Sequence, residues 1–146
     1  MEYIANTIYQ KLGINTVQSK LLNLDGRPAI ASKEITGAMA SGRDEQAASP
    51  EVRNGFLADA YLANWDVVGL AYDNIVHSKD GMCRIDNGGS MIFRAQGGDK
   101  EFTPDNIPEL QSMLIAGRPT GDVFGGITHE EIRQQSQALI DKLKPE

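Results

Sequence analysis

The chain has one cysteine, two histidines and no long apolar run among its 146 residues. The single thiol, Cys83, excludes an internal disulfide and fits a reducing compartment. With so few His and Cys residues there is no basis for a zinc site, and no apolar stretch approaches the length of a membrane-spanning helix. Residues 1–11 lack the basic start and the small-residue cleavage site of a signal peptide. We therefore expect no membrane span, and a protein that is cytoplasmic or is delivered into another cell as an effector.

Positive charge is also scarce, because 14 Lys and Arg residues stand against 20 Asp and Glu residues and the net charge is −6. A protein that binds the phosphate backbone of nucleic acid needs clustered positive charge, and the sequence contains no such cluster. We therefore expect no nucleic-acid partner. The hydrophobic content of 40% suits one compact domain, or two lobes that share one core.

The N-terminal part of the chain predicts a helix followed by a β-hairpin. Residues 2–12 have apolar side chains at helical spacing, and Gly13 closes the helix. The expected apolar stripe consists of Tyr3, Ile4, Ile8 and Leu12. Two β-prone runs, residues 16–24 and 27–35, flank Asp25-Gly26, a pair typical of a tight hairpin turn.

A linker and three helices are expected in other parts of the chain. Residues 37–49 are small and polar without apolar periodicity, and they predict a linker or hinge. Ser49 is the expected N-cap of a helix over residues 50–63. Two more helices are expected over residues 108–116 and 128–143, and the second of them begins with a capping-box pattern.

The most informative segment is residues 64–97, because it places Asp66, Asn74 and Asp86 around two short apolar runs. Magnesium is a hard cation that binds carboxylate, carbonyl and water oxygens. An Asp at a strand end beside an Asn amide oxygen therefore predicts a Mg²⁺ site completed by the phosphates of ATP. Asp66, in the loop before the first strand, can orient an incoming hydroxyl and accept its proton.

Turn residues support a strand, a turn and a second strand between these side chains. Residues 75–76 and 82–85 flank residues 77–81, which end in an Asp-Gly pair suited to a tight reversal. Gly88 and Gly89 follow at the point where the backbone leaves the second strand and can approach a ligand closely.

This order of residues resembles the catalytic core of the HipA-like and phosphoinositide-kinase-like branch of the kinase superfamily. Within that branch it is most similar to kinase-like domains of bacterial effectors and of phage head-associated proteins. The resemblance implies that Asp66 is the catalytic acid and that Asn74 and Asp86 are the Mg²⁺ ligands. It further implies that Asn74 and Gly88 belong to the nucleotide-binding site.

The same resemblance implies an α+β fold, with a protein-kinase-like large lobe in residues 50–146. The tail of a small lobe would occupy residues 1–36, with a hinge in residues 37–49. Glu2 would match the helix glutamate of such kinases, and Lys33 is our candidate for a further nucleotide contact. No Gly-rich phosphate loop with a following strand lysine precedes the first helix, so an N-terminal lobe or a partner subunit would supply them.

Arg84, Arg94 and Lys100 are expected to bring positive charge to the phosphate pocket. Arg94 is assigned a catalytic role, because a guanidinium can clamp a phosphate or the catalytic acid in a bidentate way. A structural salt bridge is the alternative for Arg94. The acids also have simpler explanations, since Asp66 can cap its own loop and Asp86 can belong to a plain turn.

Three functions remain open from the sequence. The first is an ATP- and Mg²⁺-dependent kinase that phosphorylates a Ser or Thr hydroxyl of a protein substrate, as part of a larger protein or complex. The second is a non-catalytic, truncated kinase-fold module that binds a partner protein. The third is hydrolysis of a phosphoester or nucleotide at the same acidic metal site, with water in place of the acceptor hydroxyl.

Overall fold

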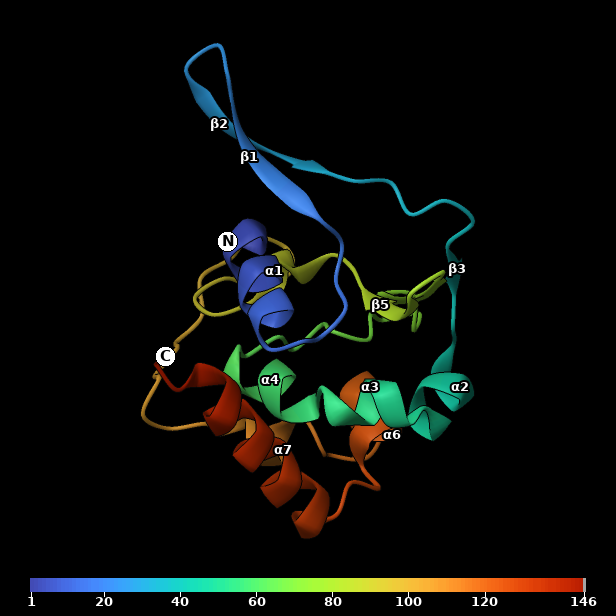
Figure 1. The fold of residues 1–146 in the computed structure, drawn as a ribbon. Coiled ribbons are helices and arrows are strands. Elements are labelled where there is room, and N and C mark those ends of the chain that lie inside the picture. The colour runs from blue at the N-terminus through green and yellow to red at the C-terminus, as the bar shows by residue number, and fades with distance from the viewer. Residues whose placement is uncertain (146) are drawn as a thin grey trace.

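The computed structural model describes residues 1–145, which form an α+β fold (Figure 1). In the described chain the helices are α1 (Glu2–Lys11), α2 (Arg43–Ala48), α3 (Pro50–Asn54), α4 (Phe56–Tyr61), the 3-10 helix η1 (Asn87–Gly89), α5 (Glu109–Ser112), α6 (Pro119–Phe124) and α7 (His129–Leu143). The strands are β1 (Ser19–Leu24), β2 (Arg27–Ser32), β3 (Met39–Ala40), β4 (Ile75–Ser78) and β5 (Gly81–Arg84). They pair into two antiparallel sheets, β1–β2 and β3–β4–β5.

The hairpin β1–β2 projects away from the rest of the molecule (Figure 1). Its turn residues Asp25 and Gly26 both have positive φ, of 51° and 80°, as a two-residue hairpin turn of the primed type requires. The Asn23 side chain accepts a hydrogen bond from the Gly26 N–H at 2.8 Å. Every residue of the two strands is at least partly exposed, so the body of the protein does not cover this hairpin.

The second sheet places Asn74 and Asp86 at one end of the β4–β5 hairpin. Ile75 pairs with Arg84, and the Ile85 N–H donates to the Asn74 carbonyl at 2.9 Å. The turn of the hairpin, between Ser78 and Gly81, lies at the other end.

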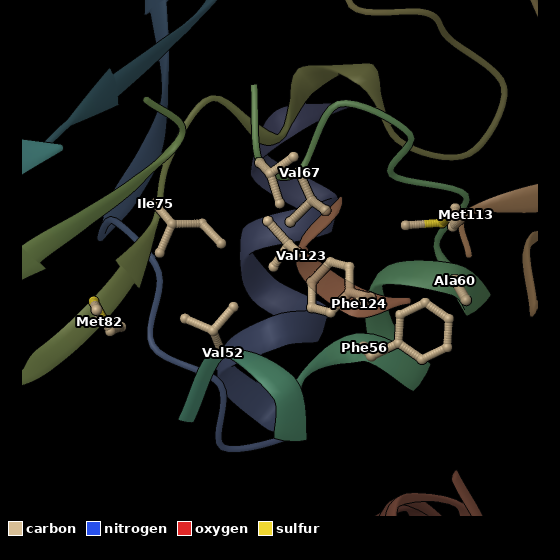
Figure 2. Close-up of a cluster of buried hydrophobic side chains, with 10 residues drawn as sticks. Val52, Phe56, Ala60, Val67, Ile75, Met82, Met113, Val123 and Phe124 are labelled. Carbon is tan, nitrogen blue, oxygen red and sulfur yellow. The ribbon is translucent and has the colours of Figure 1, made fainter. Parts of the chain in front are cut away.

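The main hydrophobic core lies between the β4–β5 sheet and helices α3, α4 and α6 (Figure 2). It consists of Val52, Phe56, Ala60, Val67, Val68, Ile75, Met82, Met113, Val123 and Phe124. The rings of Phe56 and Phe124 lie 5.1 Å apart between centroids. Val67 and Val68 follow Asp66 directly and are fully buried, so the core anchors the loop that carries this acid.

Helix α1 covers a second, smaller core, and its buried face differs from the predicted stripe. Ala5 and Tyr9 are buried together with Leu12, whereas Ile4 is 49% exposed. Asn6 is also buried, because it hydrogen-bonds the η1 turn. The helix therefore turns a partly polar face inward, which a pattern of apolar residues alone does not reveal.

The predicted helix over residues 50–63 is broken at Gly55 into α3 and α4. A Cβ atom at Gly55 would lie 2.3 Å from Nη2 of Arg84, so the guanidinium occupies the space beside the glycine. The same nitrogen donates to the Val52 carbonyl at 3.0 Å. Ser49 caps α3 as predicted, since its hydroxyl accepts from the Val52 N–H.

Residues 37–49 contain β3 and α2, in contrast to the predicted linker. Ser41 donates through its hydroxyl to the Ile75 carbonyl at 2.7 Å, and Gln46 donates to the Tyr72 carbonyl at 2.9 Å. Both side chains are buried. Hydrogen bonds to distant backbone, rather than apolar periodicity, therefore fix this segment to the body.

The C-terminal helices agree in part with the sequence. Thr128 and Glu131 form the predicted capping box of α7. Helix α5 is shorter than the predicted helix over residues 108–116, and α6 was not predicted. Pro119 at the first position of α6 is a helix-start signal that could have indicated it. Among residues 1–145, no helix is both long and apolar enough to cross a bilayer.

Candidate functional site

Asp66 and Asn74 come together at the base of the loop between α4 and β4. The Asn74 amide nitrogen donates to the backbone carbonyl of Asp66 at 2.8 Å and to its Oδ2 at 3.4 Å. Asn74 is buried, and Asp66 is partly exposed. One amide group therefore fixes both the backbone and the carboxylate of Asp66, and among residues 1–145 its oxygen accepts no hydrogen bond.

Asp86 lies close enough to influence both Asp66 and Glu2. Burial raises the pKa of Asp66, and the charges of Asp86 and Asp73 raise it further. Burial likewise raises the pKa of Glu2, again with the charge of Asp86 as the next cause. The exposed Asp86 therefore contributes negative charge to the region that contains Asp66 and Glu2.

The backbone at Asp86 adopts the left-handed conformation, with φ 56° and ψ 48°. This conformation is uncommon outside glycine, although Asp and Asn tolerate it better than most residues. It turns the chain sharply from β5 into η1. Asp86 is thus the residue that precedes η1, and it is exposed.

A buried pair of amides joins the two loops that carry the acids. Asn64 donates to Oδ1 of Asn87 at 2.9 Å and to the Tyr9 hydroxyl at 3.1 Å, and Asn87 donates to Oδ1 of Asn6 at 2.9 Å. Asn64 stands two residues before Asp66, and Asn87 directly follows Asp86. The amide pair therefore fixes the loop of Asp66 against the turn of Asp86.

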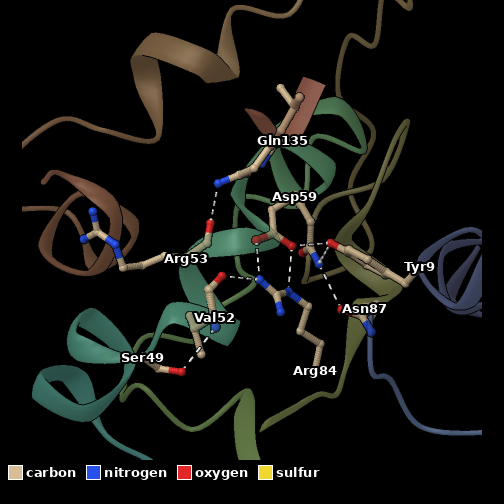
Figure 3. Close-up of polar contacts among 10 residues, drawn as sticks. Tyr9, Ser49, Val52, Arg53, Asp59, Arg84, Asn87 and Gln135 are labelled. Atoms are coloured by element: carbon tan, nitrogen blue, oxygen red, sulfur yellow. Dashed lines mark hydrogen bonds and ion pairs between the residues drawn. The ribbon is translucent and has the colours of Figure 1, made fainter. Parts of the chain in front are cut away.

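Arg84 does not reach the presumed phosphate pocket, in contrast to the expectation from sequence. Its guanidinium is buried and forms a bidentate ion pair with Asp59, with Nε–Oδ1 and Nη2–Oδ2 distances of 2.8 Å (Figure 3). The Tyr9 hydroxyl donates to the same carboxylate at 2.8 Å. Burial acts to lower the pKa of Arg84, but the charge and hydrogen bonds of Asp59, together with the charges of Tyr9 and Glu51, outweigh it, so the pKa lies above its ordinary value. Arg84 is therefore a structural residue.

The other candidate residues, Arg94, Gly88 and Lys33, lie in three different places. Arg94 lines the same pocket as Asp66, and no ion pair is formed by Arg94 within the described chain, so the salt-bridge alternative is not seen there. Gly88 lies in η1, where an added Cβ would be 3.9 Å from the Cβ of Glu2. Lys33 is exposed and lines a cavity near Ser78, at the turn end of the β4–β5 hairpin. Lys33 is thus not brought together with the acids.

Asn74 and Asp86 suit Mg²⁺ only if a bound phosphate ligand and water supply the remaining oxygen atoms. Asn74 and Asp86 offer one amide oxygen and one carboxylate at the same end of the hairpin. In the part of the chain that the structure describes, no group of three or more His, Cys, Asp or Glu residues could hold a metal ion. Magnesium accepts one or two carboxylates if phosphate and water oxygens complete its octahedron, so these residues fit a nucleotide-borne Mg²⁺.

Sequence reasoning missed the residues that support the site. Asn64 and Asn87 are ordinary loop residues in the sequence, and only their contact across 23 positions reveals the amide pair. Lys100 was expected to supply charge, but it is buried and donates to the carbonyls of Ala63 and Gly89, the latter at 2.7 Å. No local pattern in the sequence marks either arrangement.

Comparisons with protein-family models, with curated proteins and with solved structures found no match to this chain. The geometry of the site therefore carries the functional interpretation.

Proposed function

We propose that the chain is a kinase-like phosphotransferase domain, which moves the γ-phosphoryl group of ATP to a Ser or Thr hydroxyl of a protein. The observation that carries this proposal is the bridge from Asn74 to Asp66 beside Asp86. It gathers a candidate base and two candidate metal ligands at one end of a β-hairpin. Phosphoryl transfer needs mainly such positioning and charge neutralisation.

In this proposal each side chain has one role. Asn74 and Asp86 would hold Mg²⁺, which would neutralise charge on the ATP phosphates. Asp66 orients the acceptor hydroxyl and takes its proton. The hydroxyl oxygen bonds to the γ-phosphorus, and the bond to the β–γ bridging oxygen breaks, so ADP leaves with that electron pair.

The packing of α1 supports the same assignment. Helix α1 contacts η1, and Glu2 lies beside Gly88 and near Asp86. The kinase resemblance includes a helix glutamate, and Glu2 is our candidate for it. Lys33 lies elsewhere, so it does not supply the nucleotide-site lysine. A Gly-rich loop and a lysine from a larger protein or a partner subunit would cover the nucleotide and strengthen a binding that already depends on Asn74, Asp86 and Mg²⁺.

A second candidate is a non-catalytic module that binds another polypeptide. The specific observation in its favour is the uncovered hairpin β1–β2, in which Leu21, Leu24 and Ile30 are 60%, 58% and 38% exposed. An isolated two-stranded hairpin is only marginally stable in water, so a covering partner would stabilise it.

The test measures ATP binding to the full chain by titration calorimetry, with Mg²⁺ and with EDTA. We expect binding that requires Mg²⁺ and is lost in Asp86→Asn, whereas Asp66→Asn binds ATP but transfers no phosphate to a peptide. The matched control is Asp80→Asn, which removes the same charge at the far end of the β4–β5 hairpin.

Two results would contradict the phosphotransferase assignment. One is ATP binding that is equal with and without Mg²⁺, and the other is equal loss of binding in Asp86→Asn and Asp80→Asn. Absence of ATP binding by a folded chain would favour the binding module.

A further inference from the structure

A small pocket opens beside the carboxylate of Asp66. Its volume is about 180 Å³, and its lining includes Trp65, Asp66, Leu70, Arg94 and Lys100. This hollow is open to solvent and has room for one polar side chain. Asn74 and Asp86 are not part of the lining. We assign the pocket to the acceptor side of Asp66, because neither of the two proposed Mg²⁺ ligands contributes to its lining.

The charged groups that line this pocket besides Asp66 are both cations, although the chain as a whole is acidic. The Lys100 ammonium lies 4.5 Å from the centre of the Trp65 ring, and the Arg94 guanidinium carbon lies 5.8 Å from it. Lys100 uses two of its three N–H donors on the Ala63 and Gly89 carbonyls, which leaves one donor. Burial lowers the pKa of Lys100 to about 8, while Glu109 opposes this shift, so the ammonium is charged at pH 7.

The walls of the pocket combine a fixed aromatic ring with an exposed apolar rim. The Trp65 indole N–H donates to Oε1 of Glu109 at 2.9 Å, which holds the ring in place. Trp65 is 44% exposed and Leu70 is 78% exposed. A peptide lying across this rim would cover apolar surface and place one side chain in the pocket.

We propose that this pocket selects the acceptor, by binding an acidic side chain next to the Ser or Thr hydroxyl of a peptide substrate. Arg94 is the specificity residue, because its guanidinium is exposed and can bind a carboxylate in a bidentate way. Lys100 adds a second, fixed positive charge. The assignment rests on the proposed phosphotransferase function, and it names the substrate class of that site.

The test uses fluorescence anisotropy at pH 7 with the full chain and no ATP. The probes are a fluorescein-labelled peptide with one central Ser flanked by Asp and Glu, and the same peptide with Asn and Gln in their place. We expect the acidic peptide to bind about tenfold more tightly than the neutral one, because one charge-assisted hydrogen bond lowers a dissociation constant by about that factor. Arg94→Gln should remove this preference, and Arg94→Lys should restore part of it.

The matched control is Arg27→Gln, which removes one positive charge from the exposed β1–β2 hairpin. Equal binding of the two peptides, or equal weakening by Arg94→Gln and Arg27→Gln, would overturn the acidic-acceptor assignment. Preferential binding of a free dicarboxylate over the acidic peptide would also overturn it. This assay contains no nucleotide, so it tests peptide selection by itself. Selection of the acidic peptide here, together with no phosphate transfer in the separate assay with ATP and Mg²⁺, would contradict the phosphotransferase function alone.

Discussion

The ion pair of Asp59 and Arg84 is the most buried charged contact in the described chain, with side-chain exposures of 0% and 1%. Taking two charges out of water is costly, and a buried pair offsets this cost only with good geometry and further hydrogen bonds. Both conditions hold here, because the pair is bidentate and also binds the Tyr9 hydroxyl and the Val52 carbonyl. We infer that the pair specifies how α1, α3, α4 and β5 meet.

Replacing Asp59 by Ala should destabilise the protein by about 3–5 kcal/mol, because it leaves the Arg84 charge buried without a partner. Urea unfolding followed by circular dichroism measures this loss. The double variant Asp59→Ala/Arg84→Met should regain part of it. Asp44→Ala, which breaks an exposed ion pair with Arg43, is the control and should leave the midpoint almost unchanged. A loss for Asp59→Ala as small as that of Asp44→Ala would show that the pair has no structural role.

At the scale of elements, the buried pair of Asp59 and Arg84 lies at the break between α3 and α4. A helix that stops at Gly55 leaves backbone groups without helical partners. Gln135 of α7 satisfies two of them, because it donates to the Arg53 carbonyl at 2.8 Å (Figure 3) and accepts from the Leu57 N–H at 2.9 Å. Hydrogen bonds from α7 therefore stabilise the break between α3 and α4.

Gly55→Ala should cost about 1–3 kcal/mol, because the added Cβ would displace the Arg84 guanidinium in a filled interior. The same unfolding assay applies. Gly126→Ala is the matched control, since the nearest side-chain atom there is 3.6 Å away, and it should change stability by less than about 0.5 kcal/mol. Equal stability of Gly55→Ala and wild type would mean that the guanidinium is not held against Gly55.

At the scale of the whole molecule, stability is distributed unevenly. The main core joins α3, α4, α6, the loop of Asp66 and the β4–β5 sheet, so the candidate site stands on the most firmly packed part (Figure 2). The β1–β2 hairpin contributes no residue to either buried cluster. Regions with few buried apolar contacts open most readily.

Hydrogen exchange should therefore be much faster in β1 and β2 than in β4 and α4. Mass spectrometry of the full chain at low protein concentration measures the difference, with the two β-hairpins as an internal comparison. Protection of β1–β2 equal to that of β4–β5 would show that another surface covers this hairpin in solution.

The local chemistry of the sequence determined which segments form elements. Turn residues predicted both hairpins, capping residues predicted the starts of α3 and α7, and helical spacing predicted α1. These features depend on residues within a few positions of one another, so a sequence displays them directly. The contact of Asn74 with Asp66 is different, because it depends on how the loop before β4 folds back on itself across eight positions.

Only the tertiary structure decided the arrangement that depends on distant contacts. Arg84 pairs with Asp59 across 25 positions and Asn64 binds Asn87 across 23, and Gln46 holds the segment that the sequence predicted as a linker. These polar side chains are structural because they are buried. A buried polar group without a hydrogen-bond partner is costly, and the partner is a residue that the fold brings close from elsewhere in the chain. No local pattern encodes that partner.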